Sequence, residues 1–354
     1  MKAAVLFAAG PPDAFRIVDV PMPTCGDGDV LVEVMACGVS FRDVVERNGT
    51  YRRDVSFPLV IGLEISGVVR EVGRLVTLVQ VGDHVCSKAF SSCGRCRYCR
   101  SGRESTCLLR QPVRGGYSEY VALPEDAWVT VPSGVPFEVS CTLGPACGVA
   151  LNAVRDTARV QLGETVLVTG ATGGVGWPSV QLAKLAGAHV IAVTREESKR
   201  ACLMESGADE VVVMSRDGKF ARQVRSLTAD HGVDVVIDNV GSRVFDECFD
   251  SLALHGRYAL VGQLFGESTQ INLARIFFKR AQLLGVGSVS RAQLADVIAL
   301  TASGRLKPKV AAVMPLEEVA TAHSLVESGQ TVGRIVLVPS LDRLRTLQGE
   351  ADGR

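Results

Sequence analysis

The sequence has no excess charge of either sign and no long uninterrupted hydrophobic run. Its 354 residues include 38 Lys and Arg against 38 Asp and Glu, so the overall balance gives no reason to expect nucleic acid or an anionic membrane as a partner. The longest weakly polar stretch, residues 139–154, is interrupted by Pro145, Asn152 and two glycines and falls short of a membrane span. The first ten residues contain a short apolar run without a convincing cleavage site for secretion. We therefore expect a cytoplasmic protein without a transmembrane segment.

Aromatic residues are also scarce, at 5% of the chain, but hydrophobic residues make up 47% of it. That hydrophobic content is ample for two separate cores, and the length suggests about two domains. There are 11 cysteines. An odd number in a long chain disfavours the disulfide framework of a secreted protein, so a reducing compartment fits better.

The first third of the chain shows short strands separated by glycine, which is typical of an antiparallel barrel. After about Gly148 the pattern changes to strand, helix, strand at regular intervals, which predicts a parallel, doubly wound sheet. The expected barrel strands are 30–34, 66–69, 81–85 and 117–121, and the expected parallel strands are 165–169, 190–193, 211–213, 233–237, 258–261 and 283–286.

A last strand, 334–338, is most simply explained by a return of the chain to the first domain. The predicted fold class is therefore α/β plus β. The barrel domain would comprise residues 1–147 and 290–339, and the nucleotide-binding domain residues 148–289. The polar tail 340–354 is expected to be a frayed helix or disordered.

Four cysteines within 15 residues form the strongest single motif, with the spacing C-x2-C-x2-C-x7-C. A structural zinc ion takes four thiolates in a tetrahedron and leaves no position open. The alternative, four unrelated thiols in an exposed loop, is disfavoured because clustered free cysteines invite oxidation. The loop 93–107 is thus predicted to hold one zinc ion through Cys93, Cys96, Cys99 and Cys107.

A glycine-rich turn follows the first parallel strand and opens a helix. In that context it predicts a dinucleotide site, because glycine lets the backbone approach a pyrophosphate at the start of a helix. The alternative is a turn that merely packs the helix on the strand. The candidate residues are Gly170, Thr172, Gly173, Gly174, Val175 and Gly176.

The second parallel strand ends in Thr194, where an acidic residue would bind the ribose 2′-hydroxyl of NAD. Because Arg195 and Lys199 follow, a 2′-phosphate would be attracted, and we expect NADP(H). Glu196 and Glu197 oppose this assignment, and Arg195 and Lys199 could instead be solvated surface charges.

Ligands of such sheets bind beyond the carboxyl ends of the strands. Asn239, Val240 and Gly262 follow the fourth and fifth strands. They are therefore candidates for the nicotinamide end of the site.

Three further motifs carry a family resemblance: Gly62-Leu63-Glu64, the run 81–85 (VGDHV) and the run 115–120 (GGYSEY). With the cysteine loop, the glycine turn and the returning strand, they resemble the medium-chain dehydrogenase/reductase superfamily, the zinc alcohol dehydrogenase-like proteins, over residues 1–339. The resemblance implies a GroES-like catalytic domain, a Rossmann domain with a cleft between them, and a homodimer or homotetramer.

Members of this family that act on alcohols or carbonyls hold a catalytic zinc at positions matching Ser40, Leu63 and Cys147. Leucine cannot ligate, a neutral serine is a poor ligand, and one thiolate does not hold the ion. We therefore expect no catalytic zinc. The alternative is an improvised site that uses Asp43 with Cys37 and Glu64.

Without a Lewis acid, simple carbonyl reduction loses several kcal/mol of barrier lowering. Zinc-free relatives reduce activated carbon–carbon double bonds, and residues 41–64 and 304–308 most resemble acryloyl-CoA reductase-type proteins. The expected function is NADPH-dependent reduction of an enone, enal or enoyl thioester. The alternatives are an alcohol dehydrogenase or carbonyl reductase of the same superfamily, and a nucleotide-binding protein with a non-redox or regulatory role.

A proton must reach the α-carbon of such a substrate from water or from a side chain, and Tyr51 is the candidate donor. The alternative is that Tyr51 is a packed aromatic residue of the barrel. Ser40 is a candidate to orient the substrate oxygen, and Asp43 is a candidate for hydrogen bonding in the same site. Cationic contacts for the phosphates of a CoA thioester are sought among Arg42, Arg47, Arg52 and Arg53.

Overall fold

A computed structural model describes residues 1–51 and 55–344. The chain divides into two compact units, Met1–Gly148 with Ser288–Arg354, and Val149–Gly287. The boundaries expected from the sequence, 147/148 and 289/290, lie one and two residues from those of the structure. In the described part of the chain, no helix has both the length and the apolar composition needed to cross a membrane.

The first unit is built on a seven-stranded sheet in the order β16-β17-β3-β4-β5-β9, with β8 paired to β3. Every pairing in it is antiparallel except that of β16 with β17. The returning strand β17 pairs with β3 as the sequence predicts. The strands are β3 (Asp29–Val39), β4 (Glu64–Val72), β5 (His84–Ser87), β8 (Tyr120–Pro124), β9 (Trp128–Thr130), β16 (Val310–Pro315) and β17 (Arg334–Val338).

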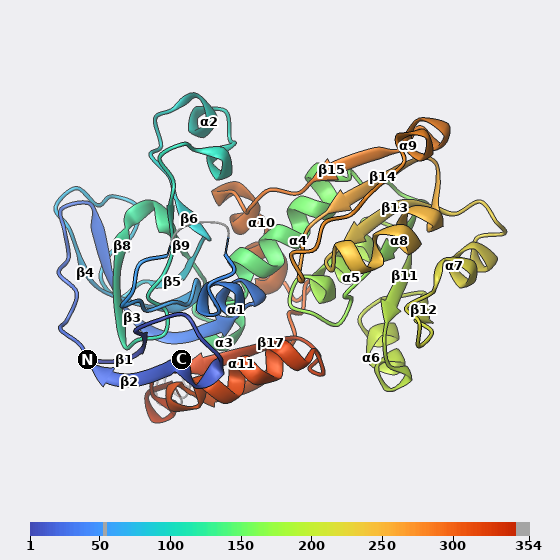
Figure 1. Cartoon of the computed structure of the whole chain (residues 1–354). Coiled ribbons are helices and arrows are strands. Elements are labelled where there is room, and N and C mark those ends of the chain that lie inside the picture. Colours follow the sequence, from blue (N-terminus) through green and yellow to red (C-terminus); the bar gives the residue numbers. More distant parts are fainter. Residues whose placement is uncertain (52–54, 345–354) are drawn as a thin grey trace. The chain divides into compact units, whose positions relative to one another are not determined.

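Two short strand pairs complete this unit. β1 (Lys2–Leu6) and β2 (Phe15–Asp19) pair antiparallel, and β6 (Phe90–Ser91) pairs with β7 (Gln111–Pro112) at the base of the cysteine loop. Figure 1 shows this loop, with its short helix α2, projecting from the sheet of the first unit. The helices of the unit are α1 (Phe41–Arg47), α2 (Arg97–Arg100), α3 (Phe137–Ser140), α10 (Arg291–Ala302) and α11 (Val319–Ser328).

The run 3–9, which faintly imitates a signal peptide in the sequence, forms part of this packed structure. Ala3 to Leu6 in β1 are buried, and the backbone of Leu6 bonds to that of Leu59 in both directions at 2.8 Å. Leu6 belongs to the main core of the unit, together with Ile61, Trp128 and Leu337. Ala3 to Leu6 are therefore core residues, whereas Phe7 is exposed.

The second unit contains a six-stranded sheet in the order β12-β11-β10-β13-β14-β15, all parallel. This is the doubly wound order, in which strands are added on one side of β10 and then, from β13 on, on its other side. The strands are β10 (Thr165–Val168), β11 (His189–Thr194), β12 (Glu210–Val213), β13 (Val233–Asp238), β14 (Leu252–Leu260) and β15 (Gln282–Gly285).

The core of this sheet consists of branched and aromatic side chains from the strands and from the helices between them, including Leu167, Ile191, Val236 and Phe249. The helices are α4 (Val149–Leu151), α5 (Gly176–Leu185), α6 (Arg200–Glu205), α7 (Ala221–Leu227), α8 (Phe245–Ser251) and α9 (Leu273–Lys279). The predicted GroES-like domain and Rossmann domain are both present.

The tail beyond β17 is packed where the structure describes it. Leu344 is 5% exposed and lies in a small cluster with Met35, Ala36 and Val338. Arg343 pairs with Glu33 on β3. Of the two expectations for the tail, a frayed helix or disorder, disorder is wrong for residues 341–344, which are helical. Residues 345–354 lie outside the described part of the chain.

Candidate active site and metal centre

The four loop cysteines converge on one point. Their sulfur atoms all lie within 4.8 Å of one another. The closest pairs are Cys96 with Cys99 at 3.5 Å, Cys93 with Cys107 at 3.6 Å and Cys93 with Cys99 at 3.9 Å. Four sulfurs bound to zinc at about 2.3 Å would be about 3.8 Å apart in a tetrahedron. The donor set therefore fits a tetrahedral zinc ion with no position left for substrate.

The base of this zinc lobe (residues 93–107) is held by the carboxylate of Asp126. It accepts hydrogen bonds from the Ser92 backbone at 2.6 Å and hydroxyl at 2.8 Å, and from the ammonium group of Lys88 at 2.8 Å. On the lobe itself, Glu104 accepts a hydrogen bond from the backbone N–H of Arg291 at 2.6 Å, at the start of α10. The lobe is thus tied to two distant segments of its own unit.

Ser40 and Asp43 form a closed pair at the start of α1. Ser40 is the N-cap, and its hydroxyl accepts from the backbone N–H of Asp43 at 3.3 Å while donating to the Asp43 carboxylate at 2.6 Å. The Asp43 carboxylate also accepts from the backbone N–H of Ser40 at 2.8 Å and from that of Gly62 at 3.3 Å. Burial raises the pKa of Asp43 to about 6, although its hydrogen bonds with Ser40 oppose that shift.

The other two positions that the family resemblance assigns to a catalytic zinc hold Leu63 and Cys147. Leu63 is 4% exposed and belongs to the main core of its unit. Cys147 lies in a π-helical segment, Leu143–Gly148, where burial raises the pKa of its thiol to about 12. A buried neutral thiol packs like a small hydrophobic residue.

Glu64, which follows Leu63 in the sequence, forms a buried ion pair with Arg334. Glu64 is 1% exposed and accepts a hydrogen bond from Arg334 at 2.8 Å. Burial raises the pKa of Glu64 to about 7, opposed by the charge of Arg334. Among residues 1–51 and 55–344, the four loop cysteines form the one group of three or more His, Cys, Asp or Glu side chains gathered closely enough to hold a metal ion.

Tyr51 follows α1, and its ring lies under the guanidinium group of Arg42 at 5.3 Å. The backbone N–H of Tyr51 bonds to Val45 at 3.0 Å. Of the other arginines proposed for phosphate contacts, Arg47 is buried and paired with Glu327 at 2.7 Å, so it faces the core and is not available. Arg52 and Arg53 lie outside the described residues.

The glycine turn in the second unit has the shape that a pyrophosphate requires. Gly170 has a φ of +57°, a conformation that favours glycine. A Cβ on Gly176, the first residue of α5, would lie 2.0 Å from the carbonyl oxygen of Gly170. No side chain caps the start of α5 at Val175. The predicted residues from Gly170 to Gly176 therefore form one narrow turn at a helix N-terminus, which fits a dinucleotide phosphate.

Beside this turn, Asp238 organises the ends of two neighbouring strands. It is fully buried and accepts hydrogen bonds from the hydroxyls of Thr169 at 2.6 Å and Tyr258 at 2.7 Å. The backbone N–H groups of Val240 and Gly241 also donate to it, at 2.9 and 3.2 Å. The sequence analysis did not single out Asp238 as a site residue.

Asn239 is fixed by the same network. Its side-chain N–H donates to the backbone oxygen of Thr169 at 2.9 Å, and its side-chain oxygen is buried without a hydrogen-bond partner in the described part of the chain. A Cβ on Gly262 would lie 2.8 Å from the carbonyl oxygen of Asn239. Asn239, Val240 and Gly262 are thus neighbours, and the buried oxygen of Asn239 offers a bound nucleotide one acceptor.

The end of β11 carries the residues expected to choose the dinucleotide. Thr194 is 6% exposed, and its hydroxyl accepts from the backbone of Glu196 at 3.3 Å. Lys199 is also buried, and its ammonium group lies 2.9 Å from the Glu196 carboxylate. This contact lowers the pKa of Glu196. Lys199 therefore compensates the acid that opposed the NADP(H) prediction, while Arg195 is exposed.

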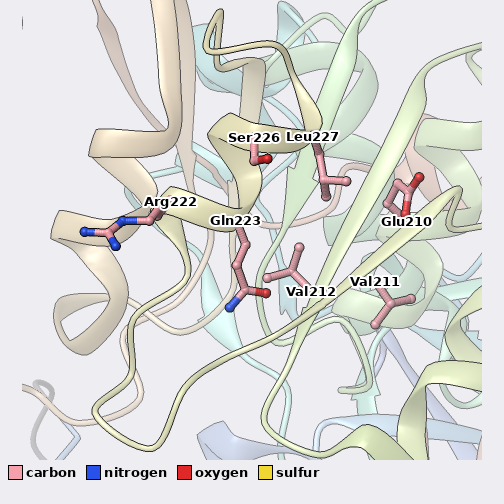
Figure 2. Close-up of a pocket in the computed structure, with 7 residues that line it drawn as sticks. All are labelled: Glu210, Val211, Val212, Arg222, Gln223, Ser226 and Leu227. Atoms are coloured by element: carbon pink, nitrogen blue, oxygen red, sulfur yellow. The ribbon is translucent and has the colours of Figure 1, made fainter.

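A surface hollow lies beside the edge strand β12 and is lined by residues of β12 and α7. Gln223 projects from α7 toward β12 (Figure 2) and donates to the backbone oxygen of Val213 at 3.4 Å. Arg200 donates to the backbone oxygen of Val211 at 2.6 Å. The side chains around this hollow cap an exposed sheet edge, a protection against unwanted pairing, and we assign no site to it.

Comparison with known proteins agrees with both units. Residues 26–133 match the alcohol dehydrogenase GroES-like domain, and residues 174–303 match the zinc-binding dehydrogenase family. The chain belongs to the zinc-binding dehydrogenases. It is therefore a member of the medium-chain dehydrogenase/reductase superfamily and an oxidoreductase by family.

The relatives of this dehydrogenase include both an acryloyl-coenzyme A reductase and alcohol dehydrogenases. It is 31% identical to an acryloyl-coenzyme A reductase of Sulfurisphaera tokodaii, covering 96% of this chain and 100% of the relative. It is 32% identical to a NAD-dependent alcohol dehydrogenase of Sulfolobus acidocaldarius, covering 95% and 99%. Among solved structures it is similar to AibC, with 41% identity, a TM-score of 0.89 and 96% of each chain covered.

Proposed function

We propose that this dehydrogenase reduces an activated carbon–carbon double bond of an enoyl thioester, with NADPH as hydride donor and without a catalytic metal ion. The observation that carries the proposal is the pair of residues at the former zinc positions. Ser40 is engaged in capping α1, and Leu63 is part of the core. Neither can hold a Lewis acid. The similarity to acryloyl-coenzyme A reductases supports the thioester class.

Reduction of an enoyl thioester adds a hydride to the β-carbon and a proton to the α-carbon. When bound, NADPH supplies the hydride. Negative charge develops on the thioester oxygen, and hydrogen-bond donors fixed in advance can stabilise it without a metal ion. The chain therefore has to provide a donor near this oxygen and a route for one proton.

The Ser40 hydroxyl is the proposed donor to the thioester oxygen. In the structure it donates to the Asp43 carboxylate at 2.6 Å. If Asp43 takes up a proton, its carboxyl group can donate to the Ser40 oxygen in return, and the Ser40 hydrogen becomes free for the substrate. Because the pKa of Asp43 is raised to about 6, this exchange costs little near neutral pH.

Tyr51 remains the proposed source of the proton for the α-carbon. Its ring is held under Arg42, two residues after Ser40. Replacing Tyr51 by Phe would keep this contact and remove only the hydroxyl. The replacement should lower turnover much more than affinity for NADPH, and an unchanged rate would exclude Tyr51 from the reaction.

The choice of NADPH over NADH rests on the end of β11. There is no carboxylate at Thr194, and the nearest acid, Glu196, is compensated by Lys199 at 2.9 Å. A 2′-phosphate would meet Arg195 without strong repulsion. Michaelis constants for NADPH and NADH on one preparation test this choice, since a preference for NADH would contradict it.

We also propose one structural zinc ion, bound by the four cysteines of the lobe.

A second copy of the chain is the proposed partner. The outer strand of the Rossmann sheet, β15, exposes Leu283, and α9 exposes Leu273, Phe277 and Phe278 by 61 to 70%. An open strand edge next to exposed aromatic rings suits pairing with an identical edge about a two-fold axis. Light scattering should give a dimer or tetramer, and Phe278→Glu should weaken it.

The function is tested by following NADPH consumption with an enoyl-CoA, a simple enone and an aldehyde. We expect turnover with the conjugated substrates, fastest with the thioester. Turnover confined to the aldehyde would instead support a carbonyl reductase. Tight NADPH binding without turnover of any of the three would support a non-redox role.

A further inference from the structure

Two arginines and a phenylalanine form a stack next to α1. The guanidinium carbon of Arg42 lies 5.1 Å from the centre of the Phe90 ring. That of Arg110 lies 4.9 Å from the centre of the same ring. Arg42 stands two residues after Ser40, whereas Phe90 and Arg110 belong to the base of the zinc lobe. We call this set the arginine ladder (Arg42, Phe90 and Arg110).

The ladder has more positive charge than its neighbours compensate. Glu46, whose side chain is 2% exposed, pairs with Arg42 at 3.0 Å and with Arg114 at 3.1 Å. One carboxylate thus serves two guanidinium groups. Arg110 contacts the backbone oxygen of Ser105 and has no acidic partner within residues 1–51 and 55–344. The ladder and Arg114 together retain a positive excess.

The ladder is also held in place before any ligand arrives. The Arg42 guanidinium is confined by Glu46, by the Phe90 ring and by the Tyr51 ring at 5.3 Å. A guanidinium group fixed in this way loses little side-chain entropy when it binds an anion. Guanidinium planes pair with phosphate in bidentate geometry, and the Phe90 ring holds the Arg42 and Arg110 guanidinium groups in place.

We propose that the arginine ladder binds the nucleotide phosphates of an acyl-CoA thioester, with Arg110 as the main phosphate contact. The inference rests on the proposed function, because it concerns the carrier part of the same substrate. It assigns the phosphate contact to Arg110 and the positioning of Arg110 to Phe90, both at the base of the zinc lobe. The lobe would then take part in substrate binding. The charge of Glu46 already offsets part of the charge of Arg42 and Arg114. Arg110 pairs with no carboxylate in the described part of the chain, so its charge should contribute most to the affinity for a phosphate.

The test compares two thioesters of the same enoyl group, one on coenzyme A and one on pantetheine, which lacks the nucleotide phosphates. Arg110→Gln should raise the Michaelis constant for the CoA ester about tenfold, the loss of one charge-assisted hydrogen bond, and leave that for the pantetheine ester unchanged. Arg103→Gln, which removes an exposed arginine from the same lobe, is the matched control and should change neither constant. Zinc content and melting temperature show that the variants are folded.

Each other outcome contradicts a separate part of the proposal. An equal effect on both esters would mean that Arg110 acts on the acyl group, for example on a carboxylate in it, and not on the carrier. No effect on either ester would remove the ladder from substrate binding. If the unaltered protein reduced neither ester, the proposed function would fail, and calorimetry with coenzyme A alone would then test the ladder: binding about tenfold weaker in Arg110→Gln supports it, and equal binding overturns it.

Discussion

The zinc lobe and the residues around Ser40 are two parts of one unit that differ in the side chains they offer to a metal ion. In the lobe, four sulfurs lie within 4.8 Å of one another and suit a tetrahedral ion. At the positions that the family resemblance assigns to a catalytic zinc, burial raises the pKa of the Cys147 thiol to about 12. The lobe offers four thiol ligands, whereas these three positions offer one thiol, with Ser40 and Leu63 at the other two.

The lobe and the residues around Ser40 are held by separate sets of contacts. The lobe is fixed by Asp126 and Glu104, through contacts that involve neither Ser40 nor Cys147. The residues around Ser40 are held by hydrogen bonds, because the Asp43 carboxylate accepts from the Ser40 backbone and Arg334 pairs with Glu64.

The largest expected effect comes from removing one ligand of the lobe. Cys107→Ala should abolish zinc binding and lower the free energy of unfolding by roughly 3 kcal/mol or more, since metal binding contributes directly to the folding of such loops. Metal analysis and thermal unfolding check both values.

The matched control is Cys147→Ala in the former catalytic site. It should leave the zinc content unchanged and cost about 1 to 2 kcal/mol for the small cavity in a buried position. A loss of zinc in the Cys147 variant, or its retention in the Cys107 variant, would contradict the contrast between the two sites.

The next effect concerns the catalytic role of Ser40. Ser40→Ala should lower turnover of the enoyl thioester about a hundredfold, as expected when one fixed donor to a developing oxyanion is lost. Its loss as helix cap should also reduce stability by about 1 kcal/mol.

Ser40→Thr keeps both a hydroxyl and a capping side chain, so it should restore most of the activity and the stability. If the alanine variant lost only stability, Ser40 would be a cap and not a participant in the reaction.

The remaining prediction concerns the pH dependence of stability from the buried carboxyl group of Asp43. Burial raises the pKa of Asp43 to about 6 in the folded protein, from about 3.9 in the unfolded chain. The folded state therefore binds this proton more tightly, and the stability that it contributes is full below pH ~4 and is lost as the pH rises to about 6.

Asp43→Asn should flatten this part of the profile. Urea unfolding of both proteins between pH 4 and about 7 measures the difference. Parallel profiles would mean that Asp43 titrates normally.

Much of the fold could be predicted from the sequence because its strands are apolar runs between turn residues. The strand at the C-terminus, Arg334–Val338, has the predicted bounds. β14 begins at Leu252, six residues before the predicted start, because His255 and Gly256 interrupt the pattern. His255 has a φ of +62° within this strand, where Val233 and Val235 mark a shift of register. A local irregularity of this kind leaves no apolar alternation to read.

The candidate site was predictable where a motif requires residues close together in the chain, as in the cysteine loop and the glycine turn. It was not predictable where partners are distant. Asp238 lies 69 residues from Thr169, and Arg110 meets the Phe90 ring only through the pairing of β6 with β7. Arg47 stands among candidate phosphate ligands in the sequence, but His323 and Glu327 on α11 bind it in the core. The roles of these residues depend on contacts with residues distant in the sequence, and a local sequence pattern does not show such contacts.

The most direct test of the account is the zinc content of a preparation that reduces an enoyl-CoA with NADPH. The account predicts one zinc ion per chain, bound by the lobe, with thioester reduction that needs no further metal. Two zinc ions per chain, with the second bound beside Ser40 and Cys147 and required for turnover, would contradict it.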